Sequence, residues 1–96
     1  MIRNVVVAHL KEGTPPEAVE AVARALRELK LPGLLRMTVG GDLGLRDGNA
    51  GFAVVSDLAD RAAYQAYDAD AEHNRIRREL VAPIVTSIER CQFEVN

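Results

Sequence analysis

The sequence predicts an α+β domain in which strands and helices follow one another in the order β-α-β-β-α-β. Three observations predict this order. Apolar residues recur at the spacing of strands in residues 2–10, 35–41, 50–58 and 88–95. Between the first two of these segments, and again before the last, apolar residues recur every three or four positions, as in helices. Turns containing proline or glycine separate several of these segments.

Length and charge set the class of protein. A chain of 96 residues is expected to form a single domain over residues 1–96 with one modest core. The net charge of −2 gives no electrostatic reason to expect a nucleic acid or an anionic membrane as partner. No secretory signal or membrane-spanning apolar run is present, and the single Cys91 excludes an internal disulfide framework. We therefore expect a cytoplasmic protein.

The first strand, residues 2–10, carries apolar side chains on both faces, which implies that both faces become covered. The even-numbered face carries Ile2, Asn4, Val6, Ala8 and Leu10. The odd-numbered face carries Arg3, Val5, Val7 and His9. Asn4 stands among apolar neighbours, so it needs a hydrogen-bond partner if it is buried. It is then either a pocket residue or a tie to the backbone.

A first helix follows the turn at residues 11–13. Thr14 and Glu17 match a capping box around Pro15, with Thr14 as the N-cap. One face of this helix is apolar, with Val19, Val22, Ala23, Leu26 and Leu29. The helix should end by residues 31–33, where proline and glycine follow one another.

Three more strands are expected after this helix. In residues 35–41, Leu35, Met37 and Val39 alternate with polar side chains. A loop rich in glycine and aspartate, residues 40–49, leads to a strand at residues 50–58 that is apolar on both faces. The last strand, residues 88–95, should place Cys91 beside Phe93 as a small buried hydrophobic residue.

Residues 64–73 hold both tyrosines and one of the two histidines. Asp60 is a plausible N-cap for a short helix that runs through Tyr67, and Asp70 is a plausible N-cap for the next helix. From there one helical stripe is formed by His73, Ile76, Leu80 and Ile84. His73 is therefore expected to point inward near the start of a helix, where Tyr67 can approach it.

The order of the elements is that of the ferredoxin-like split βαβ arrangement. Right-handed crossovers place both helical regions on one face of a four-stranded antiparallel sheet. The other face still carries apolar residues such as Val5, Val7 and Val55, and a large bare apolar face is unstable in water. We expect a homodimer in which two such faces pack together.

Several segments resemble the stress-responsive dimeric α/β-barrel (Dabb) domain family, within the dimeric α+β barrel superfamily. The resemblance is carried, over nearly the whole chain, by residues 1–7, 10–14 and 31–33, by Tyr64, Tyr67 and His73, and by residues 93–95. It implies that the sheets of two protomers pair into a dimeric α/β barrel.

The family resemblance also implies a chemistry. The family includes a plant polyketide cyclase that performs an intramolecular aldol condensation without a cofactor. Its catalytic histidine and partner tyrosine match His73 and Tyr67, whereas two further histidines of that enzyme match Asn4 and Phe52 here. An acid–base pair would thus be kept in a more apolar pocket.

We therefore assign His73 and Tyr67 as candidate catalytic residues. The candidate substrate-binding residues are Asn4, Phe52, Tyr64 and Ile76. A helix N-terminus disfavours imidazolium, so His73 could act as a neutral base on a carbon acid next to a carbonyl. The expected partner is a small carbonyl-containing or aromatic metabolite. No cofactor is expected, and two distant histidines with one cysteine give no spacing for a metal site.

Two other functions remain open. One is a structural or stress-related homodimer without turnover, in which His73 is a core residue bonded to a backbone carbonyl. The other is a monooxygenase of the haem-degrading or antibiotic-biosynthesis type. In haem-degrading members of the superfamily, an asparagine and a helical histidine act with a tryptophan. Asn4 and His73 resemble two of these residues, but the chain has no tryptophan. Arg75, Arg77 and Arg78 are expected on a solvated helix face.

Overall fold

The computed structural model describes residues 1–96 and has the predicted order of elements. The elements are β1 (Ile2–Leu10), α1 (Pro16–Arg27), β2 (Leu34–Gly41), β3 (Phe52–Leu58), α2 (Arg61–Ala69), α3 (Ala71–Ile76), η1 (Arg77–Val81) and β4 (Val85–Glu94). The last helical element, η1, is a π-helix that continues α3 without a break. No helix of this structure is both long and apolar enough to cross a bilayer.

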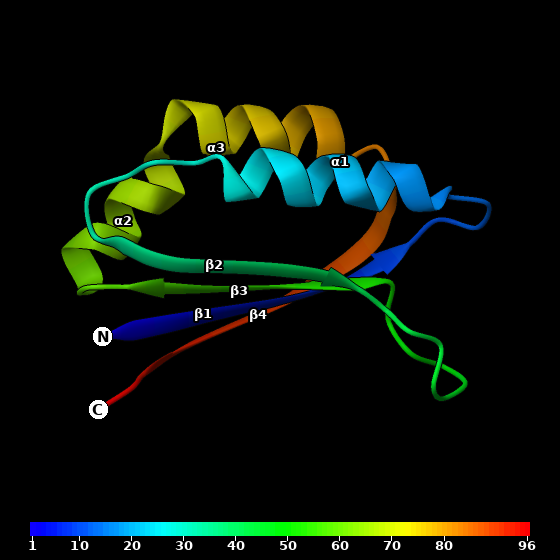
Figure 1. Cartoon of the computed structure of the whole chain (residues 1–96), viewed down its shortest axis with the longest axis horizontal. Helices are drawn as coiled ribbons and strands as arrows, with labels where there is room; N and C mark the ends of the chain where they lie inside the picture. The colour runs from blue at the N-terminus through cyan, green and yellow to red at the C-terminus, as the bar shows by residue number, and fades with distance from the viewer.

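The four strands form one antiparallel sheet in the order β2-β3-β1-β4. Figure 1 shows all the helices on one side of this sheet, so that no helix covers the other side. The predicted ferredoxin-like α+β fold is thus confirmed. In the sheet register Asn4 of β1 lies opposite Ser56 of β3 on one side and Gln92 of β4 on the other.

The core lies between the helices and one face of the sheet. Its buried residues come from both layers: Ala8, Val22, Ala23, Leu26, Leu29, Val39, Phe52, Val54, Leu58, Tyr67 and Ile76. The even-numbered face of β1 and β3 is the face toward the helices, because Ala8 and Phe52 are buried there and lie opposite each other in register. Asn4 and Ser56 are therefore polar residues placed on the core face of the sheet.

The predicted N-cap of the first helix is wrong. Pro15 occupies the N-cap position of α1, and no side chain caps this end. The Thr14 hydroxyl instead donates a hydrogen bond to the carbonyl of Lys11, at 2.7 Å. The side chain is thus used within the turn that precedes the helix.

Two predicted core residues lie on the surface of the protomer. Leu35 is 59% exposed because the register of β2 shifts between Leu34 and Arg36, which lets Leu34 take the inward position. Cys91 is exposed because it lies on the sheet face that no helix covers, opposite Val5 of β1.

The predicted N-caps of α2 and α3 are confirmed. The Asp60 side chain accepts a hydrogen bond from the backbone amide of Ala63 at the start of α2. The Asp70 side chain does the same for the amide of His73 at the start of α3. The π-helix was not predicted. Its wider turn is closed by the Ala82 amide, which donates to the carbonyl of Arg77, one residue before Pro83.

The turn before β2 fixes the position of α2. Gly33 has a φ of +81°, and its carbonyl accepts a hydrogen bond from the amide of Ala59, just ahead of α2. A Cβ at this position would lie 2.6 Å from the Cβ of Ala63 in α2. Only glycine lets the turn and the helix approach this closely.

Gly33→Ala should lower the free energy of unfolding by about 2–4 kcal/mol, because it adds overpacking to backbone strain. Gly13→Ala is the matched control, since Gly13 has a φ of +80° and no atom near its missing Cβ. The control should cost only about 1–2 kcal/mol. Urea unfolding of both variants measures the difference, and equal losses would contradict the proposed contact.

Candidate functional site

The junction of α2 and α3 brings His73 against Tyr67. Tyr67 is in the last turns of α2, and His73 is in the first turn of α3, where Asp70 caps the helix through the backbone amide of His73 at 2.9 Å. The two rings lie with their centroids 4.0 Å apart at an interplanar angle of 30°. Both side chains are buried, with His73 4% exposed. The predicted pair is therefore in contact.

One hydrogen bond determines which nitrogen of the imidazole carries the proton. The distance from His73 Nδ1 to the backbone carbonyl oxygen of Tyr67 is 2.7 Å. A carbonyl oxygen only accepts hydrogen bonds, so Nδ1 must carry the hydrogen and donate it. In the neutral ring Nε2 is then left with a free lone pair. Nε2 has no hydrogen-bond partner in the protein. Every fully buried side-chain nitrogen of the structure does have a partner, so Nε2 must be at least partly accessible.

The surroundings of the imidazole disfavour its protonation. Burial lowers the pKa of His73 below its ordinary value of 6.5, and the positive charge of Arg77 lowers it further. The carbonyl of Tyr67 acts in the opposite direction but does not cancel these effects. The neutral imidazole with a free Nε2 is therefore the form present near pH 7.

A row of polar side chains crosses the sheet and ends at Tyr67. Gln92 Nε2 donates to Asn4 Oδ1 at 2.8 Å, and Asn4 Nδ2 donates to Ser56 Oγ at 3.1 Å. The Ser56 hydroxyl in turn lies close enough to the Tyr67 phenol to lower its pKa in part. Three strands and one helix thus each supply one group. Asn4 is held by side chains and not by the backbone tie that was one of its two predicted roles.

Burial also keeps the tyrosine in its neutral form. It raises the pKa of the Tyr67 phenol, and the neighbouring Ser56 offsets only part of this rise. At neutral pH the hydroxyl therefore keeps its proton and is able to donate a hydrogen bond.

A cavity of about 50 Å³ lies between the sheet and α3. It is lined by Asn4, Val6, Ala8, Leu26, Phe52, Val54, Tyr67, His73, Ile76, Arg77, Val81, Ile88 and Arg90. This set includes both candidate catalytic residues and three of the four candidate substrate-binding residues. The volume is well below the roughly 300–1,000 Å³ of sites for drug-sized ligands. In this conformation the cavity holds a fragment of a few atoms.

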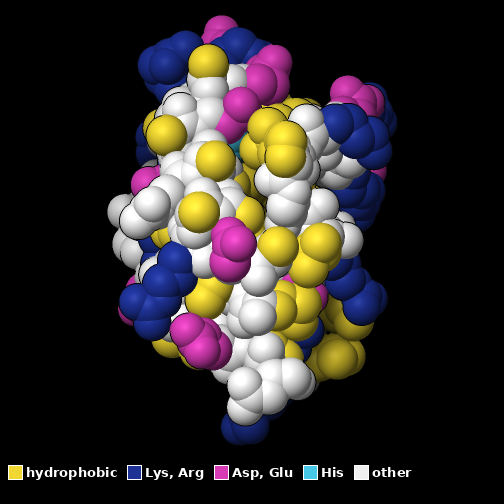
Figure 2. Space-filling view, turned by 90° about the vertical axis from the view of Figure 1, so that its left-hand side faces the viewer, with side chains coloured by type: hydrophobic (Ala, Val, Ile, Leu, Met, Phe, Trp, Pro, Cys, Tyr) yellow, Lys and Arg dark blue, Asp and Glu magenta, His cyan; other side chains and the backbone are white.

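The fourth candidate substrate-binding residue, Tyr64, does not line this cavity. Its ring centroid lies 6.3 Å from that of Tyr67, and it lines a neighbouring groove of about 370 Å³ between α2 and the end of β4. Figure 2 shows the end of the molecule where α2 and both termini lie. Hydrophobic side chains are scattered over this end with acidic side chains among them, while Lys and Arg side chains lie mainly at the top and at the sides.

Sequence reasoning missed two residues of the site. Ser56 belongs to the polar row, and the available signal was a serine on the inward face of an otherwise apolar strand. Arg77 was expected on a solvated helix face, but it lines the cavity. Its guanidinium donates to the Asp68 carboxylate at 2.9 Å and to Asn74 Oδ1 at 3.0 Å. The π-helix, which begins at Arg77, could not be read from the sequence.

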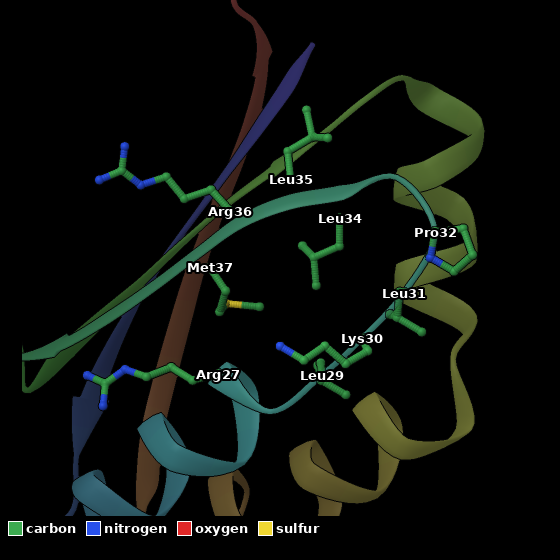
Figure 3. Close-up of a pocket in the computed structure, with 9 residues that line it drawn as sticks. All are labelled: Arg27, Leu29, Lys30, Leu31, Pro32, Leu34, Leu35, Arg36 and Met37. Carbon is green, nitrogen blue, oxygen red and sulfur yellow. The ribbon is translucent and has the colours of Figure 1, made fainter.

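A larger hollow, of about 500 Å³, lies between the end of α1 and the start of β2. Figure 3 shows leucine, proline and methionine side chains in it, together with Arg27, Lys30 and Arg36. It contains no histidine, cysteine, serine or carboxylate, so nothing there can transfer a proton near pH 7. No three His, Cys, Asp or Glu side chains of the chain gather where they could hold a metal ion.

Comparison with known proteins places these observations in a family. The model of the stress responsive A/B barrel domain, Dabb, matches residues 2–95. A dimeric ferredoxin-like protein of unknown function from Thermobifida fusca is 32% identical, with a TM-score of 0.89 over 98% of this chain and 90% of that one. No curated protein matches the sequence.

Two more distant structures share the fold. A dimeric protein of unknown function with a ferredoxin-like fold from Bacteroides fragilis is 18% identical, with a TM-score of 0.83 over 98% of this chain and 95% of that one. A hydroxynitrile lyase from Passiflora edulis is 17% identical, with a TM-score of 0.81 over 99% and 93% of the two chains. At these identities the similarity concerns the fold alone.

The lowered pKa of His73 should make the protein less stable in mild acid. The unfolded chain binds a proton on His73 more readily than the folded chain does. The contribution of neutral His73 to the free energy of unfolding is therefore complete above the unfolded pKa of about 6.5 and is lost as the pH falls below that value. Thermal unfolding of wild type and His73→Gln from pH 7.5 to 5 measures this effect. The advantage of wild type over the variant should shrink over that range, and a constant difference would contradict the depressed pKa.

Proposed function

Because the chain belongs to the stress responsive A/B barrel domain family, we propose that its cavity is a cofactor-independent acid–base site for a small carbonyl-containing or aromatic metabolite. His73 is the base and Tyr67 is its partner. Reactions of the isomerase, lyase or cyclase type begin with such a proton transfer. In this proposal residues 1–96 act as a single cytoplasmic domain.

The proposed step is removal of a proton from a carbon next to a carbonyl. The C–H bond breaks, its electron pair moves into the enolate, and the proton goes to His73 Nε2. The resulting imidazolium then returns the proton to carbon or passes it to water. A base of this kind typically contributes about 10²–10⁴-fold to the rate.

Tyr67 is the proposed donor to the developing enolate oxygen. A neutral phenol in a low-dielectric site stabilises such a charge more strongly than it does in water. The hydroxyl of Ser56, itself held by Asn4, would orient the phenol. Ser56 and Asn4 are thus positioning residues in this proposal.

The single observation that carries the proposal is the place of the His73 imidazole on the cavity lining beside Tyr67, with no protein partner for Nε2. The hydrogen bond from Nδ1 to the Tyr67 carbonyl is also the one expected of a core histidine in the structural alternative, so it does not by itself carry the proposal. It holds the ring in one orientation and leaves the basic nitrogen toward the cavity. A histidine that only fills space in a core has no need of a free Nε2 in accessible space.

The cavity volume of about 50 Å³ and the bond of the His73 imidazole to a backbone carbonyl both fit a second candidate function. A protein of this family without turnover, acting as a structural or stress-related homodimer, would need no larger space. The two functions differ in one respect that can be measured, which is whether a bound ketone loses its α-proton faster in the presence of His73.

Exchange of α-protons in D₂O, followed by proton NMR, tests the proposed base. Butane-2,3-dione and pyruvamide are suitable small neutral probes. Wild type should accelerate exchange of at least one of them, and His73→Gln should remove about 10²-fold or more of the acceleration. Tyr67→Phe should remove about 10-fold by taking away one hydrogen bond.

The matched control is His9→Gln, which removes the other histidine, on the sheet face away from the cavity. It should leave the exchange rate unchanged. If a probe shifts the NMR signals of His73 without any exchange, the pocket is a binding site without this chemistry. If no probe binds or exchanges, the structural homodimer is the better description.

We also propose that two copies of the chain pair through the uncovered sheet face. The apolar residues on this face are Val5, Val7, Ala53, Val55, Cys91 and Phe93. Phe93 is 47% exposed in the protomer, and a contiguous apolar sheet face favours burial against a partner. The Thermobifida fusca and Bacteroides fragilis relatives are described as dimeric, which supports this assembly.

Light scattering after size-exclusion chromatography should give twice the chain mass of 10.5 kDa. Val55→Lys, at an inner strand of the uncovered face, should shift the protein to the monomer because it would bury a charge. Gln65→Lys, on an exposed position of α2, is the control and should stay dimeric. A monomeric wild type would refute the proposed pairing.

A further inference from the structure

We infer that the substrate of this site carries a carboxylate, which the guanidinium groups of Arg90 and Arg77 receive at the edge of the His73 cavity. This inference rests on the proposed function of the cavity and specifies its substrate class. It follows from where the two arginines lie, what holds each of them and which charges are missing around them.

Arg90 is an exposed cation on the sheet face that otherwise forms the core. It lies opposite Val6 of β1, and the next position of β4 on this face is the half-buried Ile88, opposite Ala8. Both Arg90 and Ile88 line the cavity. Arg90 takes part in none of the ion pairs or side-chain hydrogen bonds of the structure. An arginine in this position stabilises nothing visible in the protomer.

Arg77 is the second cation, and it is held rigidly. Its side chain is 30% exposed and is fixed by the Asp68 carboxylate, the Asp68 carbonyl and Asn74. It comes from η1, across the cavity from β4. Part of its charge is offset by Asp68, so Arg90 supplies the larger free positive charge.

The cavity lining contains no carboxylate to balance these two charges. Asp68 is paired with Arg77, and Glu94 is paired with Arg61. Glu89 neighbours Arg90 in the sequence, but it extends from the opposite face of the strand. The cavity therefore presents a positive edge, and an arginine guanidinium matches a carboxylate through two parallel hydrogen bonds.

The volume of the cavity fixes which end of the substrate enters. About 50 Å³ accommodates the reacting carbon and its carbonyl but not a hydrated anionic group as well. The carboxylate would thus stay at the arginines while the C–H carbon on the far side of the ketone reaches Nε2 of His73. Such anchoring aligns the reacting atoms and favours proton transfer. The substrate class is a small oxo-carboxylate.

The proton transfer on such a substrate needs no further reactant. The α C–H bond breaks, the proton goes to Nε2, and the electron pair moves onto the ketone oxygen. The carboxylate keeps its charge throughout and remains on the arginines. Reprotonation at carbon restores the imidazole.

Pyruvate and pyruvamide form a matched pair of probes, because they differ only in the charged group. Wild type should exchange the methyl protons of pyruvate at least about 10-fold faster than those of pyruvamide at equal concentration, relative to the rates without protein. Arg90→Met keeps an apolar stem of similar length and should abolish this preference. Arg78→Met is the control, since Arg78 is also exposed and has no ion pair, but it does not line the cavity.

The outcomes separate this inference from the proposed function. His73-dependent exchange that is equal for pyruvate and pyruvamide, and unaffected by Arg90→Met, would overturn the carboxylate site and leave the base in place. Perturbation of the His73 signals by pyruvate that needs Arg90, without exchange, would support the carboxylate site and overturn the base. If Arg78→Met also loses the preference for pyruvate over pyruvamide, the preference comes from the overall charge of the protein, and the inference is overturned.

Discussion

The candidate site depends on one hydrogen bond, from Nδ1 of His73 to the backbone carbonyl of Tyr67. That carbonyl lies in the last turn of α2, where it accepts only a long hydrogen bond of 3.4 Å from the Asp70 amide, so a lone pair remains for the imidazole. The break is fixed by Asp70, which starts the next helix through the amide of His73 itself. One aspartate thus turns the chain and places the ring, while Gly33 sets how closely α2 lies against the sheet connection.

The polar row from Gln92 through Asn4 and Ser56 to Tyr67 solves a second physical problem. Polar groups on the core face of a sheet are costly unless they are paired. Here each strand supplies the partner for the next, and no buried side-chain polar atom is left unsatisfied. The row ends at Ser56, beside the Tyr67 phenol. It also connects the ring pair to the edge strand β4, which carries Arg90.

What could be predicted from the sequence was whatever depends on local pattern. The N-caps at Asp60 and Asp70 and the inward stripe that begins at His73 follow from spacing along one helix. The places of Ser56 and Arg77 in the site were not predicted, because they depend on strand register and on a π-turn. Both features bring together residues that are far apart in the chain. The same limit applies to Leu35, whose inward place is taken by Leu34 at a register shift. Alternation alone does not show where a strand changes register.

The most direct test is the tautomer of His73, read from nitrogen-15 NMR of the imidazole at pH 7.5. A hydrogen on Nδ1, with Nε2 unprotonated, is the result that the hydrogen bond to Tyr67 requires. The signals are assigned by comparison with His73→Gln. A hydrogen on Nε2, or an imidazolium at this pH, would mean that no free base faces the cavity. The acid–base site and the carboxylate substrate inferred for it would then both be untenable.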